Sequence, residues 1–227
     1  MNDVDQVAAI KAQLELMGQE NEEVLEQVSG LLEQLSEMEL MDPAEKHAKF
    51  KELSKAGAFQ VNNVDVRRLV TAGKMKLSPP RFMARTRRRL ANTSALLEEF
   101  IKRGKLELAE TLQEQLSQLN DSIVDENDAK AVTAFRSQVE TLRSSDRFQS
   151  YVEQRNTLIT EDPEIKVEAE IMATKESLAD NEEAFQERGD RITEISEMME
   201  RGEISPEEAE SQLGELEMDA GEMDEME

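Results

Sequence analysis

The stretch from Val66 to Leu90 is the part of the sequence best suited to binding chemistry, because it combines many cationic side chains with no anionic one. It contains nine Lys and Arg and no Asp or Glu, although the whole chain carries a formal net charge of -24. Guanidinium groups hold phosphates or carboxylates through paired hydrogen bonds. We call this stretch the basic island. Its predicted partner-binding residues are Arg67, Arg68, Lys74, Lys76, Arg81, Arg85, Arg87, Arg88 and Arg89.

Three anionic surfaces could face the basic island: acidic helices of this chain or its copies, an acidic partner protein, and nucleic acid. In a chain with 51 acidic residues, we expect carboxylates to be the usual partner and phosphate to be the alternative. Among the arginines, Phe82 is the only interleaved aromatic residue, so stacking on single-stranded bases is not favoured. Two short predicted helices, 42–56 and 62–72, allow a helix-turn-helix reading, but their connecting turn is longer than usual.

Few residues of the sequence could support catalysis or metal binding, and we expect no enzyme activity, no cofactor and no metal site. The sequence has no Cys, which excludes disulfides, thiolate ligands and thiol nucleophiles. His47 is the only histidine, and on a short predicted helix beside lysines we expect it to be exposed to solvent. No glycine-rich phosphate loop occurs.

Composition predicts an all-α protein whose helices bury narrow apolar seams. Of the 227 residues, 38% are hydrophobic, 34% charged and only 4% aromatic, and good helix formers dominate. No stretch approaches the apolar length of a membrane span, and the acidic N-terminus lacks the features of a signal peptide. We therefore expect a protein of the cytoplasm, or of an intracellular assembly or virion, that is neither secreted nor bound to membrane.

The first forty residues give the strongest structural signal, a seam of apolar residues that recurs with a seven-residue period. Asn21 occupies an a position of this seam, where a buried amide typically pairs with its copy on a partner helix, so we expect an oligomerisation seam between chains. The alternative is that the seam packs on another helix of the same chain, which the wider stripe at Leu25 and Leu32 also permits. The predicted seam residues are Val7, Ile10, Leu14, Met17, Asn21, Val24, Val28, Leu31, Leu35 and Met38.

Capping signals divide the rest of the chain into helices. Asp42-Pro43, Ser78-Pro79, Asp162-Pro163 and Ser205-Pro206 each combine a cap residue with a proline that suits the first helical turn. We predict a coiled-coil helix over 1–41, short helices including the basic island over 42–104, an elongated antiparallel helical bundle over 105–217 and a disordered acidic tail over 218–227. Predicted seams of the bundle are Ala109, Leu112, Leu116, Leu119 and Ile123; Val132, Phe135, Val139 and Leu142; and Phe148, Val152 and Leu158 or Ile159.

The last long helix of the bundle has an apolar stripe interrupted by polar residues. Its polar stripe positions are Thr174, Asn181 and Arg188, so we expect it to be only partly buried. The stripe itself consists of Ile171, Leu178, Phe185, Ile192 and Met199.

In composition the whole chain resembles phage capsid-scaffolding and prohead-core proteins, which are acidic, helical, Met-containing and free of Cys. The resemblance implies a non-enzymatic, oligomeric scaffold, adaptor or assembly chaperone that acts through coiled-coil and charge-complementary contacts. The alternative is a nucleic-acid-associated regulator, in which the N-terminal coil forms a dimer and the basic island contacts phosphates. We thus expect copies of this chain as partners, an acidic protein surface as a second partner, nucleic acid as the alternative, and no membrane.

Overall fold

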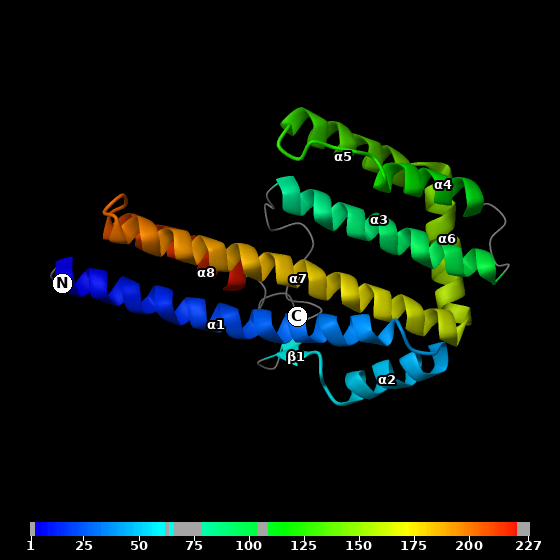
Figure 1. Cartoon of the computed structure of the whole chain (residues 1–227), viewed down its shortest axis with the longest axis horizontal. Coiled ribbons are helices and arrows are strands. Elements are labelled where there is room, and N and C mark those ends of the chain that lie inside the picture. Colours follow the sequence, from blue (N-terminus) through cyan, green and yellow to red (C-terminus); the bar gives the residue numbers. More distant parts are fainter. Residues whose placement is uncertain (1–2, 62–63, 66–78, 104–108, 222–227) are drawn as a thin grey trace. The chain divides into compact units, whose positions relative to one another are not determined.

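The computed structural model describes residues 3–61, 64–65, 79–103 and 109–221, and almost all of these residues are helical (Figure 1). This confirms the predicted all-α class. The one ladder in the described part pairs β1 (Gln60–Val61) with β2 (Val64–Asp65) in antiparallel register. The helices are α1 (Asp3–Met38), α2 (Pro43–Lys55), α3 (Pro79–Lys102), α4 (Ala109–Asn120), α5 (Ala129–Arg143), α6 (Asp146–Glu161), α7 (Pro163–Glu200) and α8 (Pro206–Gly221).

The chain divides into two compact units, and each unit is built from separated segments. The first unit comprises residues 1–42, 48–76 and 177–227, and the second comprises residues 43–47 and 77–176. The beginning of α2 and the beginning of α7 therefore belong to the second unit, while the remainder of each helix belongs to the first.

In the first unit, α1 lies antiparallel to the second part of α7. Lys11 faces Glu200 near one end, and Ser29 donates a hydrogen bond of 2.6 Å to Glu182 towards the other. The apolar residues of α1 that begin the seven-residue seam share a core cluster with residues of α7 and α8. This cluster contains Ile10, Leu14, Met17, Ile192, Ile195, Met199, Ala209 and Leu213.

Asn21 sets the register of α1 along α7. Its side chain is only 4% exposed, and its Nδ2 donates a hydrogen bond of 2.8 Å to the carbonyl oxygen of Phe185. Gly189 lies one helical turn further along α7, and a Cβ atom at that position would stand 3.0 Å from the same Nδ2. A glycine at this point lets the amide approach the α7 backbone, and a shift of register would leave a polar group buried without a partner.

Short signals in the sequence fix the ends of the helices as predicted. Ser205 and Glu208 form a capping box at the start of α8, since each backbone N–H donates to the side chain of the other residue. Gly57 and Gly202 have φ of +71°, a conformation that glycine adopts at little cost after a helix. The helix α8 continues to Gly221, so residues 218–221 of the predicted disordered tail are helical. Residues 222–227 lie outside the described part.

The second unit buries its core between α3, α4, α5, α6 and the beginning of α7. Phe100 and Phe148 contact Tyr151, with ring centroids 6.2 Å and 5.9 Å from its own. Burial raises the pKa of Tyr151 to about 12, against the opposing charge of Arg155. The predicted α5 seam is confirmed, because Val132, Phe135, Val139 and Leu142 are all buried.

Two expectations about burial are wrong. Ile123 was expected to extend the α4 seam, but α4 ends at Asn120 and the Ile123 side chain is completely exposed. Thr174 and Asn181 were expected at a partly exposed stripe, yet they are 4% and 0% exposed. The four successive residues 178–181 are all buried, and they span a complete helical turn. At this point α7 is therefore covered on every side, including the side of its polar residues.

Replacing Gly189 by Ala should destabilise the first unit, because the new methyl group displaces the Asn21 amide from the Phe185 carbonyl. Gly30→Ala is the matched control, since nothing lies within 4 Å of a Cβ atom there. In a helix interior that control should gain about 0.5–1 kcal/mol. We expect Gly189→Ala to be less stable than the control by about 1–3 kcal/mol, the cost of an unsatisfied buried amide. Urea unfolding followed by circular dichroism measures both, and equal gains for the two variants would contradict the register contact.

Candidate functional site

The described part of the basic island lies on α3. One of its residues, Arg87, binds the C-terminal end of α4. Its guanidinium donates to the carbonyl oxygens of Asn120 and Ser122, the latter at 2.6 Å. Asn120 is the last residue of α4, whose free carbonyls favour a nearby cation. The Arg87 guanidinium also stands 5.6 Å from the ring centre of Phe135 on α5. Arg87 therefore acts as a structural clamp within the second unit.

A second arginine of the island forms an ion pair with α7. Arg89 Nε lies 2.9 Å from Glu176 Oε1, although the angle is not that of a linear hydrogen bond. The other carboxylate oxygen, Oε2, accepts a hydrogen bond of 3.2 Å from Asn92. All three side chains are partly buried, which makes the pair stronger than one at an open surface.

The remaining island residues are not gathered into a described site. Arg85 and Arg88 lie on α3 and are partly buried. Arg81 also lies on α3, but its side chain is outside the described residues. Arg67, Arg68, Lys74 and Lys76 lie outside the described residues altogether. The second predicted helix of the helix-turn-helix reading, 62–72, is wrong at Val64–Asp65, which form strand β2, and its other residues lie outside the described part. That the island binds a partner therefore stays a prediction.

The predicted oligomerisation seam on α1 is covered by its own chain. Eight of its ten residues are buried, while Val7 and Val24 are half-buried. Part of the covering comes from α7 and α8, as the shared apolar cluster shows. The alternative in which the seam packs on helices of the same chain is therefore the arrangement of this structure. Association between copies stays a prediction. It would have to use other surfaces of the chain, or an exchange of α1 between copies.

The structure reveals an ionic cluster on α2 and α7 that the sequence did not suggest. Lys46 Nζ and His47 Nε2 each lie 2.7 Å from a different carboxylate oxygen of Glu168. The His47 side chain is 13% exposed, so its predicted solvent exposure is wrong. A carboxylate accepts only, and the Nε2 of His47 therefore carries the donated proton. No periodicity could have indicated this contact, because the partners are 121 residues apart.

Glu168 is held in its ionised form by this cluster. Burial of the carboxyl group acts to raise its pKa, but the hydrogen bonds and charges of Lys46 and His47 outweigh burial. The pKa of Glu168 consequently lies below its usual range, and the interaction ties the first turn of α2 to α7 within the second unit.

No described helix is long and apolar enough to cross a membrane. In the part of the chain that the structure covers, no group of three or more His, Asp and Glu side chains is placed to bind a metal ion. Comparison with known protein families, with curated protein sequences and with solved structures found no match.

Removing the Glu168 charge should make stability less dependent on pH. The folded-state pKa of this group is depressed, so its contribution is present above the pKa of the unfolded chain and is lost as the pH falls through the folded-state pKa. Glu168→Gln should lose about 1–3 kcal/mol near neutral pH and differ less from the parent in acid. The exposed Glu170→Gln is the control. Chemical unfolding at several pH values tests this, and a constant difference down to low pH would contradict it.

Replacing Arg87 by Met should destabilise the second unit by about 1–3 kcal/mol, because two carbonyl oxygens lose a charged donor. Arg147→Met is the control, since Arg147 is exposed on α6. Thermal unfolding followed by circular dichroism compares the two variants. If both melt together with the parent, Arg87 does not stabilise the end of α4.

Proposed function

We propose that this chain is a non-enzymatic helical scaffold, adaptor or assembly chaperone that associates with copies of itself through charge-complementary surfaces. The observation that supports this most is the segregation of charge between helices. The α1 sequence has nine Asp and Glu but a single Lys, and α8 has six Asp and Glu but no Lys or Arg. Charges so separated along one chain favour contacts between unlike surfaces of different copies.

The acidic side chains of α1 are placed for such contacts. The helix buries its apolar seam within the first unit and leaves Glu15, Glu22, Glu26, Glu33 and Glu37 exposed. Lys11 and Glu200 are themselves 49% and 62% exposed, and an ion pair of this kind adds little stability. The acidic face is therefore better explained by contacts with a partner, or by solubility, than by stabilisation of the unit.

Coverage of the α1 seam changes how self-association would occur. A coiled coil between copies through this seam would first require α1 to leave α7 and α8, which exposes a large apolar area. Association through outer surfaces carries no such cost. We therefore place the contacts between copies on exposed side chains and treat exchange of α1 as the costlier route.

Binding of nucleic acid through the basic island is the alternative function. Two of its arginines, Arg87 and Arg89, already bind groups of the second unit. Their replacement would disturb the fold as well as any contact with phosphate. A test for nucleic acid should therefore keep both residues and replace Arg67 and Arg68.

The mass of the protein in solution tests the proposal. At low salt we expect species heavier than the 25.7 kDa chain, and we expect them to dissociate as salt screens the contacts. Light scattering after size-exclusion chromatography measures this. A single 25.7 kDa species at every salt and protein concentration would contradict self-assembly. Binding of DNA or RNA with a steep salt dependence, lost in Arg67→Glu/Arg68→Glu, would favour the alternative.

A further inference from the structure

The loop between α4 and α5 displays an isoleucine that no part of the described chain covers. Ile123 has a relative exposure of 101%, the highest of the large apolar residues in the described part. The neighbouring acidic residues Asp121 and Asp125 are exposed and Glu126 is partly so. None of these three carboxylates forms an ion pair with a described Lys or Arg. The loop therefore combines one apolar side chain with several negative charges.

The structure holds this loop on both sides of Ile123. The Ser122 carbonyl accepts a hydrogen bond of 2.6 Å from Arg87, and the Ser122 hydroxyl donates to the carbonyl of Leu119. On the other side, Val124 packs against the core of the second unit. Because its two neighbours are fixed, Ile123 is presented in a defined position, and little conformational entropy remains to be lost when a partner covers it.

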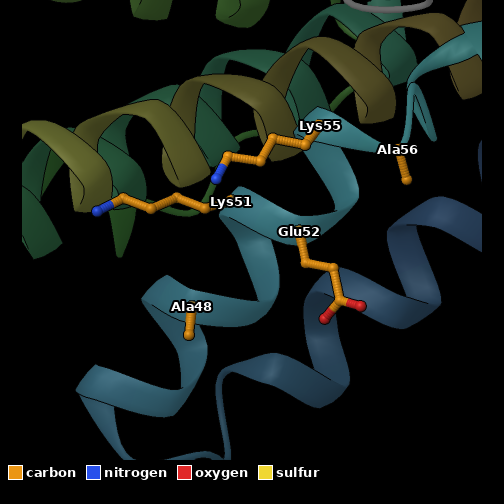
Figure 2. Close-up of a pocket in the computed structure, with 5 residues that line it drawn as sticks. All are labelled: Ala48, Lys51, Glu52, Lys55 and Ala56. Carbon is orange, nitrogen blue, oxygen red and sulfur yellow. The ribbon is translucent and has the colours of Figure 1, made fainter.

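A shallow, open depression on α2 has the complementary character. It is lined by four residues on one face of α2, at spacings of three and four, and by the residue that follows the helix: Ala48, Lys51, Glu52, Lys55 and Ala56. The two alanine methyl groups and the methylene stems of the lysines make most of its lining apolar. Lys51 and Lys55 extend in the same direction from the helix, whereas Glu52 points away from their charged ends (Figure 2). Neither lysine is paired with a carboxylate of the described residues.

We propose that the 121–126 loop of one copy docks into the α2 depression of a second copy. Ile123 would lie against the alanines and the lysine stems, while the carboxylates of the loop would face the ammonium groups of Lys51 and Lys55. The charges of the two surfaces are opposite, and each surface is exposed in the single chain. This inference rests on the proposed function, of which it names the contact.

The two surfaces are different parts of the chain, so the contact is heterologous. Each copy would then offer one loop and one depression, which lets copies add head to tail. A contact made by one loop is small, and its strength would come from repetition along the assembly. Weak repeated contacts of this kind suit a scaffold that must form and disperse.

Sedimentation velocity of the full chain and its variants tests the contact. Ile123→Asp and Lys51→Glu/Lys55→Glu should each weaken self-association about tenfold or more, as loss of a central apolar anchor or of its charge partners does. Leu40→Asp is the control for the isoleucine, since Leu40 is another exposed apolar residue. Arg147→Glu/Lys166→Glu makes the same change in charge as the double lysine variant. Both controls should behave as the parent, and circular dichroism checks that every variant is folded.

Restoration experiments show whether the two surfaces meet. Adding Asp121→Lys and Glu126→Lys to the Lys51→Glu/Lys55→Glu variant reverses both charges and should restore association. Asp125 is left unchanged because its side chain accepts the Asn127 N–H. A mixture of Ile123→Asp with Lys51→Glu/Lys55→Glu should form species no larger than a dimer, because only one of the two possible contacts remains intact.

The outcomes separate this inference from the proposed function. If the parent protein is always monomeric, self-assembly and this contact both fail. If the parent associates and neither variant weakens it, or the charge reversal restores nothing, the loop–depression contact is overturned while self-assembly stands. Equal weakening by the control variants would also overturn it, since the effect would then come from charge or solubility alone.

Discussion

The first unit depends on the antiparallel packing of α1 along α7, and a buried polar contact helps to fix the register of this packing. Apolar seams alone tolerate several registers, since shifting a helix by one heptad places similar side chains opposite each other. The Asn21 amide removes this freedom, because only one register brings it to the Phe185 carbonyl beside Gly189. The apolar cluster near the α8 hairpin then forms with the matching residues of α7.

Charge has a different use in the second unit, where cations hold helix ends and acidic side chains in place. Arg87 binds the carbonyls at the end of α4, Arg89 pairs with Glu176, and Lys46 shares Glu168 with His47. Arg87 and Arg89 of the basic island thus stabilise the second unit itself. In the first unit, Ser29 donates a hydrogen bond to Glu182, while many acidic side chains of α1 are exposed.

Much of the local structure could be predicted from the sequence, because caps and periodicity are local properties. Pro43, Pro79, Pro163 and Pro206 each begin a helix, and the seams of α1 and α5 are buried where the period placed them. Periodicity identifies an apolar face but not the helix that covers it. The sequence therefore could not choose between a second chain and α7 as the partner of α1, nor foresee that both units are assembled from separated segments.

The error at His47 and the formation of the first unit have the same cause, namely contacts between distant parts of the chain. Asn21 and Phe185 are 164 residues apart, so during synthesis α1 leaves the ribosome long before the helices that cover it. Its apolar seam must stay unpaired, or be covered by something else, until α7 and α8 have been made. In that interval the nascent chain exposes a long amphipathic helix, a species that chaperones or another nascent copy on the same messenger could bind.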